Sequence, residues 1–158
     1  MRRVIVGVAV FVCSAAVTAC SLDRSALVQD ATYAAVLTGA REAPSVVTTA
    51  SGSATFRITG AAAVYVVSAS GFTTTLTVGH VHLGGSGVVG PVLVPFSITA
   101  QAGAVATGSI DLSAPVTFNN ITISGDSLRR LFETGQAYVN LHTAAFPGGE
   151  IRGQIVRQ

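Results

Sequence analysis

Short runs of apolar or alternating residues, separated by Gly, Ser, Thr and Pro, follow one another from about residue 31 onward. The valines, threonines and isoleucines of these runs suit the half-buried surface of a β-strand. Alanine is also abundant and favours helices, but the many glycines and prolines shift the balance to strands. The spacing predicts an all-β fold, an antiparallel immunoglobulin-like or Greek-key β-sandwich. We expect strands at residues 32–38, 53–59, 63–69, 75–83, 91–99, 104–112, 136–143 and 150–156.

One segment has the pattern of a short helix instead. Ser124-Gly125-Asp126 can supply an N-terminal cap, and Leu128, Leu131 and Phe132 recur on one helical face. Gly135 can end the helix with a left-handed backbone conformation. We therefore expect one short helix that packs on the sheet.

The first 19 residues have the pattern of an export signal. Arg2 and Arg3 form a basic start, and the apolar run from Val4 to Val17 is short for a membrane span. Val17-Thr18-Ala19-Cys20 resembles the bacterial lipobox, whose cysteine is lipidated when the preceding peptide is removed. Ordinary cleavage or an uncleaved anchor is the alternative. We expect a signal peptide over residues 1–19, a lipidated Cys20 with a tether over residues 20–30, and one domain over residues 31–158.

Both cysteines fit this interpretation, because Cys13 lies inside the expected signal and Cys20 would carry the lipid. No disulfide is then expected in the mature domain. Ser21 stands where aspartate commonly marks retention at the inner membrane of two-membrane bacteria. By that resemblance, we expect the protein to be lipid-anchored at the outer membrane or cell surface and to face the periplasm or the exterior.

Charge excludes some partners. The chain has a formal net charge of +2, from 9 basic and 7 acidic residues, and loss of Arg2 and Arg3 would leave the two signs balanced. It contains no lysine and no basic run, so the electrostatic footprint of a nucleic-acid-binding protein is missing. The expected partners are the membrane, through the lipid, and an envelope or extracellular protein.

The 3 histidines are the main candidates for metal binding. His80 and His82 are two apart on an expected strand, so their side chains share one face. His142 lies on another expected strand and would be the third ligand if the two strands are close. Imidazole suits zinc and copper, and Glu150 or Asp111 could complete the set or orient a ring.

A structural role is the alternative for the histidines. His82 and His142 would then hydrogen-bond backbone or side-chain groups where the two segments meet, because buried polar groups need partners. No cofactor is expected in that case.

A second group of polar residues is interpreted as a structural network. Glu150 and Arg152 share a strand face, and Glu42 is expected to approach Arg152 or Arg57 across the sheet. Asn140 is a further member. We expect no catalytic residue in this network, because a general acid would need a cleft and a partner carboxylate.

Five segments together resemble the CHRD domain family, named for repeats in chordin and common in exported bacterial proteins. They are Leu37-Thr38-Gly39-Ala40-Arg41-Glu42-Ala43-Pro44, Gly79-His80-Val81-His82-Leu83-Gly84-Gly85-Ser86-Gly87, Tyr138-Val139-Asn140-Leu141-His142-Thr143, Phe146-Pro147-Gly148-Gly149 and Glu150-Ile151-Arg152-Gly153-Gln154-Ile155. No activity is established for most of this family. The resemblance implies a non-enzymatic surface binding or structural module, with the loops at residues 40–52, 84–90 and 144–149 as candidate contact surfaces.

Two other classes of function remain open. His80-Val81-His82 on a sandwich strand also resembles copper-zinc superoxide dismutases, so an envelope Cu/Zn-binding or redox protein that uses the three histidines is the alternative. A subunit of a larger surface assembly is the third possibility, and an exposed sheet edge or apolar patch would be its signature.

Overall fold

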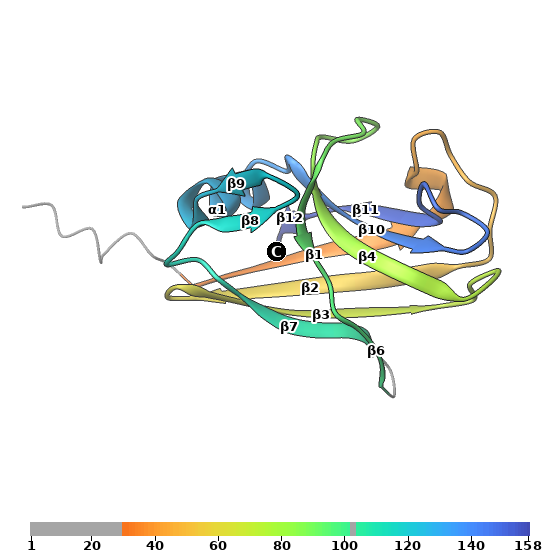
Figure 1. Ribbon diagram of the computed structural model, residues 1–158, viewed down its shortest axis with the longest axis horizontal. Helices are drawn as coiled ribbons and strands as arrows, with labels where there is room; N and C mark the ends of the chain where they lie inside the picture. Colours follow the sequence, from red (N-terminus) through yellow and green to blue (C-terminus); the bar gives the residue numbers. More distant parts are fainter. Residues whose placement is uncertain (1–29, 102–103) are drawn as a thin grey trace, which may run out of the picture.

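The computed structural model describes residues 30–101 and 104–158 (Figure 1). The expected signal peptide, the lipidated Cys20 and all but the last residue of the tether lie outside the described residues. Among those described, no helix has the length and hydropathy needed to span a membrane.

A large antiparallel sheet dominates the fold. Its strands follow the order β5-β4-β10-β11-β1-β2-β3-β7-β6, and β12 also pairs with β1. A separate hairpin, β8-β9, lies with the helix α1 at one end of the molecule (Figure 1). The strands are β1 (Ala31–Thr38), β2 (Ser51–Thr59), β3 (Ala62–Ser70), β4 (Leu76–Leu83), β5 (Val92–Pro95), β6 (Ile98–Gln101), β7 (Ala104–Asp111), β8 (Val116–Phe118), β9 (Ile121–Ile123), β10 (Ala137–Thr143), β11 (Ile151–Gln154) and β12 (Val156–Arg157); a 3-10 turn, η2 (Gly39–Arg41), follows β1.

The sheet curls so that its two ends face each other across the core. In Figure 1, β4, β10 and β11 run along one side and β2, β3 and β7 along the other. Phe96, which follows β5, packs on Tyr65 of β3 and Phe56 of β2, with ring centroids 4.8 and 6.5 Å apart. This arrangement confirms the expected all-β, sandwich-like fold.

The helix α1 (Gly125–Glu133) closes one end of the core, as the sequence predicted. The Ser124 side chain caps it by accepting a hydrogen bond from the Ser127 backbone N–H, and Gly135 has a φ of 63° just beyond its end. Leu128 and Phe132 are buried. Phe132 lies edge-on to Phe56 at 5.0 Å between ring centroids, so the helix is fixed to the centre of the sheet.

Two expected strands are each divided in the structure. Residues 91–99 form β5, which pairs with β4, and β6, which pairs with β7, and the chain crosses between the two ends of the sheet at Pro95-Phe96-Ser97. Proline cannot donate to a strand ladder, and the Phe96 ring turns into the core. Residues 150–156 are likewise divided at Ile155 into β11 and β12, which pair with different parts of β1.

The hairpin β8-β9 was not predicted. Asn119 and Asn120 form its turn with φ angles of 46° and 64°, the left-handed values that a two-residue turn between antiparallel strands requires. Asparagine tolerates this conformation better than most residues. The Asn-Asn pair between Val116-Thr117-Phe118 and Ile121-Thr122-Ile123 was therefore a usable sequence signal.

Strand β10 is buried on both faces along its whole length. Its odd-numbered residues, among them Val139 and Leu141, face the hydrophobic core. Its even-numbered residues lie on the opposite side of the pleat. We call this side of β4, β10 and β11 the polar face; it carries His80, His82, Tyr138, Asn140, His142, Arg152 and Gln154.

Candidate metal centre

Strand pairing brings the three histidines together on the polar face. In the β4–β10 register, His80 lies opposite Asn140 and His142 lies opposite Val78, so the two imidazoles are diagonal neighbours. The Nδ1 atom of His80 is 3.3 Å from Nε2 of His142. One ring nitrogen from each of His80, His82 and His142 lies within 4.8 Å of the other two. Three imidazole nitrogens at this separation can reach one metal ion.

Backbone carbonyls fix the orientation of two of the rings. His82 donates a hydrogen bond from Nδ1 to the Gly90 carbonyl, and His142 donates from Nδ1 to the Pro147 carbonyl, each at 2.9 Å. A carbonyl can only accept, so each Nδ1 carries the proton and each Nε2 keeps its lone pair. The Nε2 of His82 is buried and has no hydrogen-bond partner among the described residues. This arrangement matches metal-binding histidines, whose second nitrogen commonly donates to an outer-shell acceptor.

The electrostatic surroundings keep all three rings neutral. His82 and His142 are each 8% exposed, and His80 is half-buried. Burial, together with the charges of His142 and His82, lowers the pKa of His80 to about 4. Burial also lowers the pKa values of His82 and His142, although the Gly90 and Pro147 carbonyls oppose the shift. A neutral imidazole is the form that binds a metal.

His82, Tyr138 and Arg152 form a stack of three side chains. Its ring lies parallel to the Tyr138 ring, with the centroids 4.9 Å apart and the planes inclined by 13°. The guanidinium of Arg152 covers the Tyr138 ring at 3.4 Å from its centroid. The Tyr138 hydroxyl accepts from the backbone N–H of Gly90, the residue whose carbonyl binds His82. The stack and the loop therefore hold one imidazole from two directions.

The carboxylates considered as additional ligands lie elsewhere. Among the described residues, the group that could hold a metal consists of the three histidines alone. Asp111, at the end of β7, accepts hydrogen bonds from the backbone and side chain of Ser113. Glu150 is fully buried and accepts four hydrogen bonds from Thr48, Thr73 and Thr143. The outer-shell acceptors are the two backbone carbonyls, which side-chain patterns in the sequence cannot reveal.

The polar residues of the expected network separate into two places. Glu42 meets Asn140, whose Nδ2 is 3.5 Å from the Glu42 Oε2 atom, and Arg152 acts on Glu42 through its charge. Burial raises the pKa of Glu42 to about 7, although Arg152 opposes the shift. Glu150 instead binds the threonines described above. Its hydrogen bonds lower its pKa despite the opposing effect of burial.

A cavity of about 280 Å³ adjoins Glu42 and Pro147. Gly149, at a φ of 128°, passes so close that a Cβ there would lie 2.5 Å from the Asn140 side chain and 2.7 Å from Glu42 Oε1. Within residues 30–101 and 104–158, the Oε1 atom of Glu42 and the Oδ1 atom of Asn140 are buried without hydrogen-bond partners. Only glycine allows the loop after His142 to close over this pair.

Comparison with protein families identifies one match. The model of the CHRD domain family matches residues 33–155. Comparisons with curated proteins and with solved structures gave no match. The matched range contains every strand from β2 to β11, all three histidines and the loops that orient them. The chain therefore belongs to the CHRD domain family.

Proposed function

We propose that this CHRD domain is a non-enzymatic binding module of the cell envelope and that its ligand is a zinc or copper ion held by His80, His82 and His142. The CHRD family itself suggests a binding or structural module. The proposal adds the ligand. It rests on the three imidazole nitrogens that lie within 4.8 Å of one another on the polar face.

The orientation of the rings carries the proposal. A histidine that only tied two segments together would need one hydrogen bond and could leave its second nitrogen in any direction. Here His82 and His142 both use Nδ1 for that bond, so each Nε2 keeps its lone pair for another partner. The Nε2 of His142 lies 3.3 Å from Nδ1 of His80. The buried, unpartnered Nε2 of His82 is costly unless an ion or another donor completes it.

The donor set suits zinc and copper. Three neutral nitrogens are typical ligands for both metals, and three protein ligands leave a further coordination position open. His80 is the least buried of the three ligands. An open position is compatible with a bound water or with a small ligand on the metal.

Elemental analysis after loading with zinc or copper tests the proposal on the purified protein without an affinity tag. Wild type should retain near-stoichiometric metal, whereas His82→Ala and His142→Ala should lose it. Loss of one outer-shell partner already weakens metal binding by about 10–100-fold, so loss of a direct ligand should cost more.

Val81→Ala is the matched control. Val81 lies between the two histidines of β4 but faces the core and is fully buried, so its truncation should cost about 2 kcal/mol of stability without removing a ligand. If Val81→Ala lost metal as completely as His82→Ala, the loss would reflect the fold and not the imidazoles. Absence of metal in wild type, with destabilised histidine variants, would leave the histidines as structural hydrogen-bonding groups.

We also propose that the protein is exported and anchored through a lipid on Cys20. The sequence Val17-Thr18-Ala19-Cys20 after an apolar run supports this. Mass spectrometry of the N-terminal peptide should find a lipidated cysteine, and Cys20→Ser should release the protein from the membrane fraction. An unmodified Cys20 in a chain that retains residues 1–19 would refute the anchor.

A further inference from the structure

Arg152 is a buried cation that forms no ion pair within the described part of the chain. It is 2% exposed and is among the largest fully buried side chains. Its Nη2 donates to the carbonyls of Gly85 and Val88, at 2.8 and 2.9 Å. One face of its guanidinium covers Tyr138. These contacts position the group but do not neutralise its charge.

Three of its five N–H donors remain available. Both hydrogens of Nη2 are used by the two carbonyls, and the described residues offer no acceptor to Nε or Nη1. The acidic group that acts on Arg152 is Glu42, whose pKa of about 7 leaves it partly protonated at neutral pH. A buried guanidinium with free donors is costly unless an anion pairs with it.

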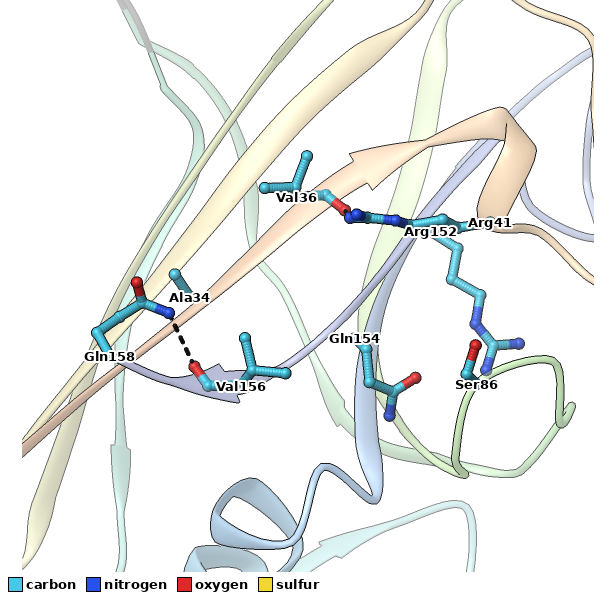
Figure 2. Close-up of a pocket in the computed structure, with 8 residues that line it drawn as sticks. All are labelled: Ala34, Val36, Arg41, Ser86, Arg152, Gln154, Val156 and Gln158. Atoms are coloured by element: carbon cyan, nitrogen blue, oxygen red, sulfur yellow. Dashed lines mark hydrogen bonds between the residues drawn. The ribbon is translucent and has the colours of Figure 1, made fainter.

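A cavity of about 310 Å³ opens at this guanidinium (Figure 2). Its polar lining consists of Arg41, Ser86, Arg152, Gln154 and Gln158, and none of the acidic residues that the structure describes contributes to it. Figure 2 shows Arg152 extending towards Ser86, while Arg41 extends along β1, where it donates to the Val36 carbonyl. Two cationic side chains from different elements thus face one cavity.

The remaining lining is aliphatic. Ala34 and Val36 of β1 and Val156 of β12 form that side of the cavity. Its volume lies at the lower end of the range for small-ligand pockets, about 300–1,000 Å³. The combination of two cationic side chains and a small apolar wall fits a short aliphatic chain that ends in an anion.

We propose that this cavity binds the carboxylate group of a short aliphatic ligand between Arg152 and Arg41. The Nε–H and Nη1–H groups of Arg152 remain as separate charge-assisted donors, each able to bind one oxygen of an anion such as a carboxylate. The carboxylate comes either from a free acid or from the end of a peptide chain. This site is separate from the metal centre and does not rest on metal binding.

Nuclear magnetic resonance titration of the purified, metal-free protein in a buffer without carboxylates tests the proposal. The probes are butyrate as the free acid, N-acetylalanine as the chain end, and N-acetylalaninamide as the neutral match of the second. Saturable shifts of the Ser86 and Gln154 backbone signals are expected with a carboxylate and not with the amide. Butyrate binding alone would assign the site to free acids, and tighter binding of N-acetylalanine would assign it to chain ends.

Two variants complete the test. Arg41→Gln, at an exposed side chain, should keep the fold and weaken carboxylate binding by about tenfold, the worth of one charge-assisted contact. Arg152→Lys keeps the charge but loses the Nε–H and Nη1–H donors, so binding should fall further if the variant folds. Equal shifts with acid and amide, shifts that never saturate, or unchanged binding by Arg41→Gln would each overturn the proposal.

Discussion

The Glu150 carboxylate is expected to be one of the most stabilising polar groups of the domain. It is fully buried and accepts hydrogen bonds from the Thr48 hydroxyl at 2.6 Å, the Thr73 backbone and hydroxyl at 3.1 Å each, and the Thr143 hydroxyl at 2.6 Å. These donors come from three separate segments. Glu150→Ala would therefore release the loops before β2 and β4 from the loop after β10.

The loss of stability in Glu150→Ala depends on which of the threonine donors can bind water instead. A hydrogen bond to a charged group contributes about 1.5–3 kcal/mol. Thr73 is exposed and Thr48 is half-buried, so water can reach their hydroxyls, but Thr143 is only 1% exposed. Glu150→Ala should thus lower the free energy of unfolding by about 3–5 kcal/mol, the range for breaking a buried charged network. Glu150→Gln keeps one oxygen and lets hydroxyls turn to accept from its amide, so about 1 kcal/mol is expected.

Urea unfolding followed by circular dichroism, at neutral pH and at about pH 3, measures both variants. Hydrogen bonds hold the folded pKa of Glu150 below its ordinary value of 4.5. Its contribution is therefore complete above pH 4.5 and is lost as the pH falls through the lower, folded pKa. The difference between wild type and Glu150→Gln should shrink in acid. A loss below about 1 kcal/mol for Glu150→Ala, as at an ordinary surface site, would refute this reasoning.

Three further predictions concern other positions. Burial raises the pKa of Glu42 from 4.5 to about 7, so the contribution of Glu42 to stability should decline as the pH rises across that interval. In urea unfolding, the stability of wild type relative to Glu42→Gln should therefore fall between these pH values, a difference in which the opposite effect of the three histidines cancels. Gly149→Ala should cost more than about 1 kcal/mol in thermal unfolding because of its positive φ and close contacts, whereas Gly148→Ala, with open space around it, should be neutral. Phe132→Ala should cost about 3–5 kcal/mol and the half-buried Leu131→Ala less; equal losses would mean that α1 does not pack through Phe132.

Local patterns in the sequence predicted where the helix and strands form better than they predicted which strands pair. Residues 124–135 contain a cap, an apolar face and a terminal glycine, which suffice to define a helix, and α1 forms there. The run 91–99 contains apolar residues throughout, so its pattern could not show that the chain leaves one strand neighbour for another at Phe96. Which strands pair is a property of the whole sheet.

The candidate metal site likewise has one part that a local pattern predicted and another that required the structure. The period of two along β4 placed His80 and His82 on one face from sequence alone. The approach of His142 required the β4–β10 register, and the orientation of its ring required the carbonyl of Pro147. Glu150 was expected beside Arg152, but the threonines that bind it come from distant segments whose approach no local pattern records.

The position of Tyr138 gives the domain a built-in optical reporter. The chain has no tryptophan and 3 tyrosines, so its intrinsic fluorescence comes from tyrosine alone. Tyr33 and Tyr65 lie in the core against Phe132 and Phe96, whereas Tyr138 is held between the guanidinium of Arg152 and the imidazole of His82. Copper bound at the histidines would therefore quench mainly the fluorescence of Tyr138. The emission of the unlabelled protein can therefore test both proposals, the metal ion on one side of Tyr138 and the carboxylate on the other.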